Sequence, residues 1–250
     1  MLNPILEITL LAFLGSIAGL IGGVIFLLKK DWAKSLCRYA IPFAAGVLIS
    51  VALLYTIPES MRVLGEGAMV VVLATFILAF VFEELFAGLH HHEDRKHSML
   101  KNSVPLVIFG DTVHNFIDGI AIAGAYLVDP MFGLVVALAT FLHETPHEIG
   151  DFGILFSAGW SRKKVLLANT LSASATFVGA FFTYFVAFGS QSFVGYALSV
   201  AGGVFLYLGA SDFLPEVSDG NGKALPWKNL SIFIFGAVLM YLLLFIIPEH

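Results

Sequence analysis

Two short segments of the chain combine histidines with carboxylates at spacings that suit metal binding. The first reads Asp-Thr-Val-His-Asn-Phe-Ile-Asp-Gly at residues 111–119, and the second reads His-Glu-Thr-Pro-His-Glu-Ile-Gly-Asp at residues 143–151. Each segment lies near the middle of an apolar stretch that is long enough to cross a bilayer. Because ionisable side chains at that depth are costly and usually functional, the two segments predict a metal site inside a membrane.

The polar residues of each segment share one face of a helix. An α-helix turns about 100° per residue, so they span an arc of roughly 100° in the first segment and roughly 140° in the second. These residues are Asp111, His114, Asn115 and Asp118 in the first helix and His143, Glu144, His147, Glu148 and Asp151 in the second. At about 2.5–3.5 kcal/mol each, five carboxylates at the bilayer centre would cost roughly 12–18 kcal/mol. A hydrogen-bond network that only joins two helices is the alternative, but eight ionisable groups facing one way favour metal binding.

The composition indicates a membrane protein. Of the 250 residues, 58% are hydrophobic and 12% are charged, and the mean hydropathy is +0.91, whereas soluble domains carry about 25% charged residues. The net charge of −5 is spread thinly and suggests no nucleic-acid partner. Cys37 is the single cysteine, which excludes a disulfide framework and a thiolate metal cluster. No basic residue precedes the first apolar run, so we expect a retained first span rather than a cleaved signal.

The apolar runs predict an all-α integral membrane protein with eight transmembrane helices in a single domain covering residues 1–250. The expected spans are 4–28, 39–57, 68–89, 104–127, 131–157, 164–188, 193–213 and 229–248. Of the 13 Lys and Arg residues, only Arg62 falls in an even-numbered loop. Since basic residues favour cytoplasmic loops, the odd-numbered loops are expected in the cytoplasm and both termini outside.

An internal repeat relates the second expected span to the seventh. Residues 44–59 align without gaps to residues 201–216, and the two spans run in opposite directions. The two polar segments also resemble each other, with His114 lying over His143. Inverted repeats around a site at the membrane midplane are frequent in secondary transporters. We therefore expect a 3+2+3 arrangement, in which helices 1–3 and 6–8 are inverted repeats that flank the metal-binding helices 4 and 5.

The residue types favour transport of a divalent cation. Imidazole together with carboxylate suits Zn²⁺ and other first-row divalent metals. Residues at i and i+4, such as His143 and His147, can hold one ion, and Asn115 and Glu144 could hold a second. Several partial ligand sets in one pore suit transport, because an ion must leave as well as enter. No phosphate-binding loop of the G-x-x-x-x-G-K-[ST] type occurs, so direct ATP hydrolysis is not the driving force.

An intramembrane zinc metalloprotease is the alternative function. The sequence from His143 through Glu144 to His147 matches the H-E-x-x-H motif of zinc proteases. Two observations count against this interpretation. Pro146 falls inside the motif and disturbs the helical turn that would bring both histidines to one metal, and a protease has no use for the polar residues at 111–118.

The same segments carry a family resemblance. His-Asn-x-x-Asp-Gly at 114–119 and His-Glu-x-Pro-His-Glu-x-Gly-Asp-Phe at 143–152 resemble the fourth- and fifth-helix signatures of the ZIP family of divalent-metal transporters, in its LIV-1/GufA-like branch. The resemblance covers the whole chain. It implies a homodimer in the cell (inner or plasma) membrane, with no enzymatic activity and no catalytic cofactor. It also implies uptake of Zn²⁺, and often of Fe²⁺, Mn²⁺ or Cd²⁺, into the cytoplasm through a binuclear site between helices 4, 5 and 6.

The resemblance also implies a role for each ligand. One metal site would contain His114, Asp118 and His147; the other would contain Asn115, Glu144 and Asn169; His143 would tune selectivity, and Glu148 would bridge the metals or serve the exit. Candidates for the metal entrance or exit are Asp111, Asp151 and the tract His90, His91 and His92. The chain departs from many members at Tyr55, where they carry a histidine near the entrance. It also lacks the long His-rich segment of animal members, which suggests a small prokaryotic form.

Overall fold

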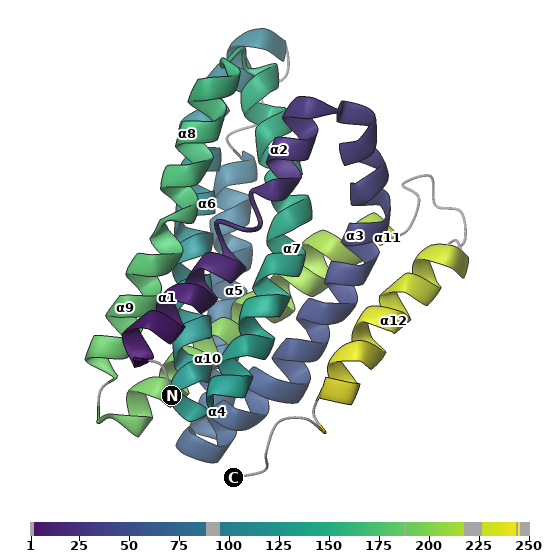
Figure 1. The fold of residues 1–250 in the computed structure, drawn as a ribbon. Coiled ribbons are helices and arrows are strands. Elements are labelled where there is room, and N and C mark those ends of the chain that lie inside the picture. The colour runs from purple at the N-terminus through teal and green to yellow at the C-terminus, as the bar shows by residue number, and fades with distance from the viewer. Residues whose placement is uncertain (1–2, 89–95, 188, 218–226, 244, 246–250) are drawn as a thin grey trace.

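The computed structural model describes residues 3–88, 96–187, 189–217, 227–243 and 245. These residues form helices, and no strand occurs among them. In chain order the helices are α1 (Pro4–Gly15), α2 (Ile21–Leu28), α3 (Lys30–Val51), η1 (Ala52–Thr56), α4 (Ile57–Leu64), α5 (Gly67–Gly88), α6 (Lys96–Val128), α7 (Pro130–Ser157), α8 (Arg162–Ala173), α9 (Ala175–Val186), α10 (Gln191–Tyr207), η2 (Leu208–Phe213), α11 (Leu214–Val217) and α12 (Trp227–Leu243). The expectation of an all-α protein is confirmed for this part of the chain, which forms a single bundle (Figure 1).

Several of these helical runs are suited to a membrane. Within the described residues, five are long and apolar enough to cross one: Lys30–Leu64, Gly67–Glu84, Val104–Val128, Arg162–Val186 and Gln191–Phe213. The apolar helices α1 and α12 are shorter, at 12 and 17 residues. Helix α7 has 28 residues and is not among the five, because its polar cluster lowers its mean hydropathy.

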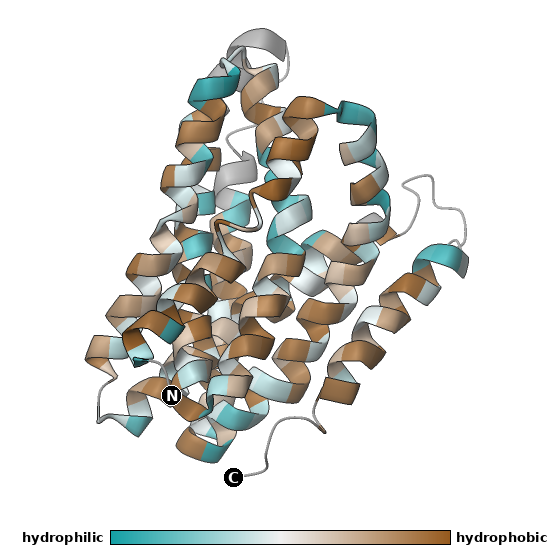
Figure 2. Cartoon of the chain, in the orientation of Figure 1, coloured by the Kyte–Doolittle hydropathy of each residue, from teal (hydrophilic) through white to brown (hydrophobic). Residues whose placement is uncertain are grey.

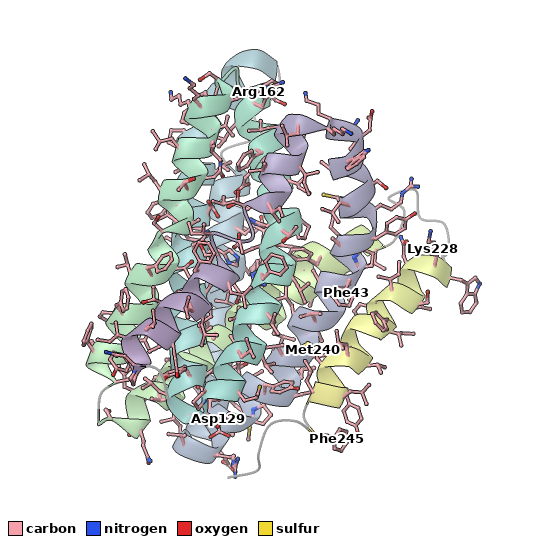
Figure 3. The ribbon with its side chains drawn as sticks, viewed as in Figure 1. Phe43, Asp129, Arg162, Lys228, Met240 and Phe245 are labelled. Atoms are coloured by element: carbon pink, nitrogen blue, oxygen red, sulfur yellow. The ribbon has the colours of Figure 1, made fainter. Side chains whose placement is uncertain are left out.

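Outside the polar segments of α6 and α7, hydrophilic residues gather at the ends of the bundle. Figure 2 shows hydrophilic residues at the upper ends of α3, α8 and α12 and hydrophobic residues along most outward faces. In Figure 3, Arg162 lies at the top of the bundle and Asp129, which joins α6 to α7, lies at the bottom. The distribution of basic residues therefore predicts that the end of the bundle with Arg162 faces the cytoplasm.

Two of the expected spans are interrupted. The first is broken between α1 and α2 at residues 16–20, and the sixth is broken at Ser174 between α8 and α9. The Ser16 hydroxyl donates a hydrogen bond to the carbonyl of Ala173, so the two breaks meet inside the bundle. Broken helices leave backbone groups without helical partners, and at membrane depth they occur where protein or a cavity surrounds them.

Helices α6 and α7 run antiparallel through the middle of the bundle (Figure 1). Helix α6 packs against α1, α7, α8, α9 and α10, and α7 packs against α1, α2, α3, α6 and α8. Asp129 caps the N-terminus of α7, since its carboxylate accepts hydrogen bonds from the backbone N–H groups of Met131 and Phe132 at 2.8 and 3.1 Å. This tight connection turns the chain sharply and brings the polar faces of both helices together.

Candidate metal centre

Four side chains of α6 and α7 converge on one point. His114 and Asp118 come from α6, and His143 and Glu144 come from α7; these four residues are the inner cluster. The Nε2 atom of His114 lies 3.0 Å from Glu144 Oε1, 3.5 Å from Asp118 Oδ2 and 3.2 Å from His143 Nε2. His143 Nε2 lies 3.3 Å from Asp118 Oδ2. Asp118, His143 and Glu144 are buried from solvent, and His114 is largely buried.

The spacing within the inner cluster fits a small divalent cation. Zinc binds histidine nitrogens and carboxylate oxygens at 2.0–2.2 Å in a tetrahedron, so neighbouring ligand atoms should lie roughly 3.3 Å apart. Four of the six distances between the ligand atoms run from 3.0 to 3.5 Å, and all six are below 4.8 Å. His143 is also held in place from its other ring nitrogen, because Nδ1 lies 3.0 Å from the carbonyl oxygen of Ala139. A backbone contact of this kind orients a metal-binding imidazole.

Further carboxylates adjoin the inner cluster. Asp111, Glu144 and Glu148 form a second set, in which one oxygen of each lies within 4.8 Å of the others. Both carboxylate oxygens of Glu148 are buried and have no hydrogen-bond partner, and the same is true of Asp118 Oδ1. Buried charged oxygens without donors are costly, and a bound cation would satisfy them. Glu144 belongs to both groups, so it is placed to bridge two ions.

Asn115 is buried beside these groups and is already hydrogen-bonded. Its amide nitrogen donates to Asp111 Oδ1 at 2.8 Å, and its oxygen accepts from the hydroxyls of Thr176 and Ser16 at 2.9 and 3.3 Å. In this conformation Asn115 orients Asp111. The sequence did not predict that Ser16 and Thr176 would reach the site. Each stood out only as a hydroxyl residue within an apolar span.

Asn169 lies on α8 and is also buried. Its amide donates to the carbonyl of Val165, one turn earlier in the same helix, at 2.8 Å. The assignment of Asn115 and Asn169 as ligands of a second metal stays a prediction.

The structure groups the histidines differently from the ligand sets expected by resemblance. His143, not His147, lies in the cluster with His114 and Asp118. The His147 ring stands 5.3 Å from the ring of His114, but its Nδ1 atom lies 3.8 Å from Asp151 Oδ2, and it groups with Asp111 and Asp151. The relative axial position of α6 and α7 determines which histidine faces His114, and the periodicity of one helix does not fix that position.

A cavity of about 560 Å³ lies between α5, α6, α7, α10 and η2. Its polar lining includes Asp111, His114, His147, Asp151, Glu83 and Asp212. Helix α6 begins at the Arg162 end of the bundle, and α7 ends there. Asp111, His147 and Asp151 are therefore nearer to that end than the inner cluster is. Nothing in the spacing of Glu83 or Asp212 indicated that they would share a cavity with the polar segments.

Two remaining predictions concern the entrance and the loop. Tyr55 is buried, donates a hydrogen bond to the carbonyl of Met240 and stacks on Phe132 at a ring distance of 6.0 Å. Tyr55 therefore packs between helices. It occupies the position where many members of the family that the sequence resembles carry a histidine. The tract His90, His91 and His92 lies outside the described residues, so its proposed role is open.

Comparisons with known proteins agree with the chemistry of the site. The family model described as ZIP zinc transporter matches residues 100–244, more than half of the chain. Human zinc transporter ZIP10 is 36% identical over 133 residues, which are 53% of this chain and 16% of that protein. The zinc transporter foi of Drosophila melanogaster is 42% identical over 114 residues, 45% of this chain and 16% of that protein. The rat metal cation symporter ZIP8 is 40% identical over 114 residues, 46% of this chain and 24% of that protein. The matches thus span between about a sixth and a quarter of these relatives.

Proposed function

Because the chain belongs to the ZIP zinc transporter family, we propose that it carries divalent transition-metal cations into the cytoplasm. Zn²⁺ is the first candidate, with Fe²⁺, Mn²⁺ and Cd²⁺ as others, and the metal is the substrate, not a catalytic cofactor. The observation that carries this proposal is the inner cluster inside the bundle, in which four of the six distances between ligand atoms are 3.0–3.5 Å. Imidazole and carboxylate ligands suit these borderline cations.

The binuclear centre of this proposal uses Glu144 as the bridge. The inner cluster would hold one ion, and Glu144 with Glu148 would hold the second, next to Asp111. The ligand roles predicted for Asn115, His147 and Asn169 would need side-chain rotations that free them from their present contacts. Several ligand sets in one pore, each of them incomplete, favour movement of an ion over its permanent retention.

The protein is a multi-pass cell-membrane protein, and we propose eight spans in a 3+2+3 arrangement with both termini outside. Interruptions of the helices support the inverted repeat. The second and seventh expected spans align at an offset of 157 residues. At this offset the π-helical segment η1 aligns with residues 209–213 of η2. Ile17 in the first break aligns with Ser174 in the second.

Close helix contacts support the repeat independently. Gly22 on α2 and Gly179 on α9 are also 157 residues apart, and a side-chain carbon at either would collide with a backbone carbonyl. The carbonyl opposite Gly22 belongs to Thr145 on α7, and the one opposite Gly179 belongs to Phe116 on α6. Thr145 and Phe116 are 29 residues apart, which is the offset of His143 from His114. In the eight-span numbering, the first span would thus contact the fifth in the same way as the sixth span contacts the fourth.

The metalloprotease alternative is not favoured by this geometry. A zinc protease holds one metal with both histidines of H-E-x-x-H and leaves the glutamate free as a base. Here His143 and His147 belong to different groups, and Glu144 contributes an oxygen to the inner cluster itself. The single domain over residues 1–250, the homodimer and the LIV-1/GufA-like branch remain parts of the proposal. The relatives reported are animal proteins, so a prokaryotic form stays a prediction.

Uptake into proteoliposomes tests the function. The purified chain is reconstituted, and the entry of Zn²⁺, Fe²⁺, Mn²⁺ and Cd²⁺ is followed with a trapped indicator against protein-free vesicles. We expect saturable uptake that is fastest for Zn²⁺. Absence of uptake for all four ions, together with cleavage of a membrane peptide, would reverse the assignment in favour of the protease.

A further inference from the structure

A surface groove of about 470 Å³ lies between α2 and the first turns of α3. It is lined by Ile25 on α2 and by Trp32, Ser35, Leu36 and Tyr39 on α3. The four α3 residues are spaced three or four positions apart, so they share one face of that helix. Trp32 is 63% exposed and Tyr39 is 37% exposed. The groove is therefore open to whatever surrounds the bundle.

A lysine ammonium group lies over each aromatic ring of the groove. Lys29 Nζ stands 4.0 Å from the centre of the Trp32 ring, and Lys228 Nζ, which comes from α12, stands 4.3 Å from the centre of the Tyr39 ring. Trp32 and Tyr39 are seven residues apart, which is about 10 Å of helix. Within the described part of the chain, neither lysine forms an ion pair with a carboxylate. The groove thus carries two positive charges that these residues leave unpaired.

The end of the groove at Tyr39 offers several hydrogen-bond donors to an anion. Lys228, at the upper end of α12 in Figure 3, donates to the Tyr39 hydroxyl oxygen at 2.9 Å, and an ammonium group has two further N–H bonds to give. The Arg38 side chain approaches the same hydroxyl. Since the Tyr39 oxygen accepts in these contacts, its own proton is available to donate. A phosphate oxygen placed here would receive hydrogen bonds from charged donors, which are the stronger kind.

The position of the groove points to a lipid. Lys29 joins α2 to α3 at the upper end of the bundle in Figure 1, which is the end predicted to face the cytoplasm. Tryptophan and tyrosine are enriched where a membrane meets water, and lysines on the cytoplasmic side meet a negatively charged leaflet. Ile25 and Leu36 add hydrocarbon contact between the two lysines. An occupant should therefore combine a phosphate with an acyl chain.

We propose that this groove binds an anionic phospholipid of the cytoplasmic leaflet. Lys228 and Tyr39 hold its phosphate, Lys29 adds attraction for its negative charge, and one acyl chain lies against Ile25 and Leu36. A soluble phosphate would leave the apolar lining uncovered, and a zwitterionic lipid would bring no net charge to the two lysines. None of these residues belongs to the metal-binding clusters, so the proposal is independent of the metal that the protein carries.

Tryptophan fluorescence can report on this groove alone. The chain has three tryptophans, so Trp160→Phe together with Trp227→Phe leaves Trp32 as the only one. This protein is reconstituted in phosphatidylcholine vesicles that contain increasing fractions of a quenching lipid, brominated near the glycerol end of its acyl chains. Brominated phosphatidylglycerol and brominated phosphatidylcholine are compared. We expect half-maximal quenching at a fraction of phosphatidylglycerol about fivefold or more below that of phosphatidylcholine, since one lysine near the surface strengthens anionic-lipid binding by about fivefold.

Substitution of each lysine tests the assignment within the protein that retains only Trp32. Lys228→Ala should raise the required fraction of phosphatidylglycerol by about fivefold and leave the phosphatidylcholine curve unchanged. Lys29→Ala should act in the same direction without disturbing the contact between α3 and α12. Lys164→Ala is the matched control and should have no effect. Lys164 also lies over a tryptophan ring, at 3.7 Å from the centre of Trp160, but neither residue lines the groove.

Three results would overturn the proposal. Equal quenching of Trp32 by the two lipids would show that the groove does not select an anionic headgroup. An equal loss of preference with Lys164→Ala would mean that the total positive charge of this end attracts the lipid. The same preference at Trp160, measured in a protein with Trp32→Phe and Trp227→Phe, would lead to that conclusion as well.

Discussion

Asp118 is the carboxylate on which both histidines of the inner cluster converge. Its Oδ2 atom lies 3.5 Å from His114 Nε2 and 3.3 Å from His143 Nε2, while its Oδ1 atom has no partner. A carboxylate so placed is poorly satisfied by the protein alone. At the scale of single residues, function and stability should therefore respond to substitutions in opposite directions.

Replacing Asp118 by Ala should abolish Zn²⁺ uptake while the protein still inserts and folds. A carboxylate at the bilayer centre costs about 2.5–3.5 kcal/mol on the insertion scale, so its loss should leave thermal stability equal or higher. Uptake by proteoliposomes and thermal unfolding in detergent measure the two effects. Loss of folded protein would instead support a hydrogen-bond network that only joins α6 to α7.

Replacing Glu144 by Gln should weaken metal binding at two positions together, because Glu144 belongs to both ligand sets. We expect affinity for Zn²⁺ to fall by about tenfold or more, with a changed order of preference among Zn²⁺, Fe²⁺, Mn²⁺ and Cd²⁺. Titration of the purified variant with each ion provides the measurement. Unchanged affinity combined with a loss of peptide cleavage is the result that a protease would give, since there Glu144 would act as general base.

At the scale of helices, irregularities gather around the polar centre. The breaks at residues 16–20 and at Ser174 meet through the hydrogen bond from Ser16 to Ala173, and Ser16 also reaches Asn115. Helix α7 continues without a break through Pro146. Pro146 has no N–H group, so the carbonyl of Leu142 lacks its helical partner and remains free for water or an ion beside His143.

Replacing Pro146 by Ala should slow transport without lowering stability. An internal proline costs a helix about 3 kcal/mol, and part of this should be regained as a higher melting temperature. A straighter α7 would rotate His147 relative to Glu144 and separate their ligand sets. Pro42→Ala is the matched control, because Pro42 also lies inside a helix, α3, and is buried, but does not belong to either polar segment. Normal transport by Pro146→Ala would show that the site depends on side chains alone.

At the scale of the whole molecule, close contacts set the positions of the helices relative to one another. Gly119 on α6 faces the Thr176 carbonyl on α9, and Gly179 on α9 faces the Phe116 carbonyl on α6. Helices that touch through glycine backbones gain packing contacts that lipid cannot replace. The contact also places Thr176 where its hydroxyl reaches Asn115.

Replacing Gly179 by Ala should push α6 away from α9 and destabilise the bundle. Overpacking of this kind costs about 1–3 kcal/mol, so the melting temperature and Zn²⁺ uptake should both fall. Gly150→Ala is the control, because a side-chain carbon there meets nothing within 4 Å and the helix should gain about 0.5–1 kcal/mol. Equal melting temperatures for the two variants would mean that the α6–α9 contact is not tight.

Sequence periodicity was sufficient to identify the polar faces of α6 and α7, because the angular position of a residue on one helix depends only on its number. It also gave the metal-ligand character of the site and the alignment of residues 44–59 with 201–216. The partner of His114 was decided by tertiary structure, since it depends on how far α6 and α7 are shifted along each other. The packing of α6 against α7 brings His143 into the inner cluster and leaves His147 facing the cavity with Asp151.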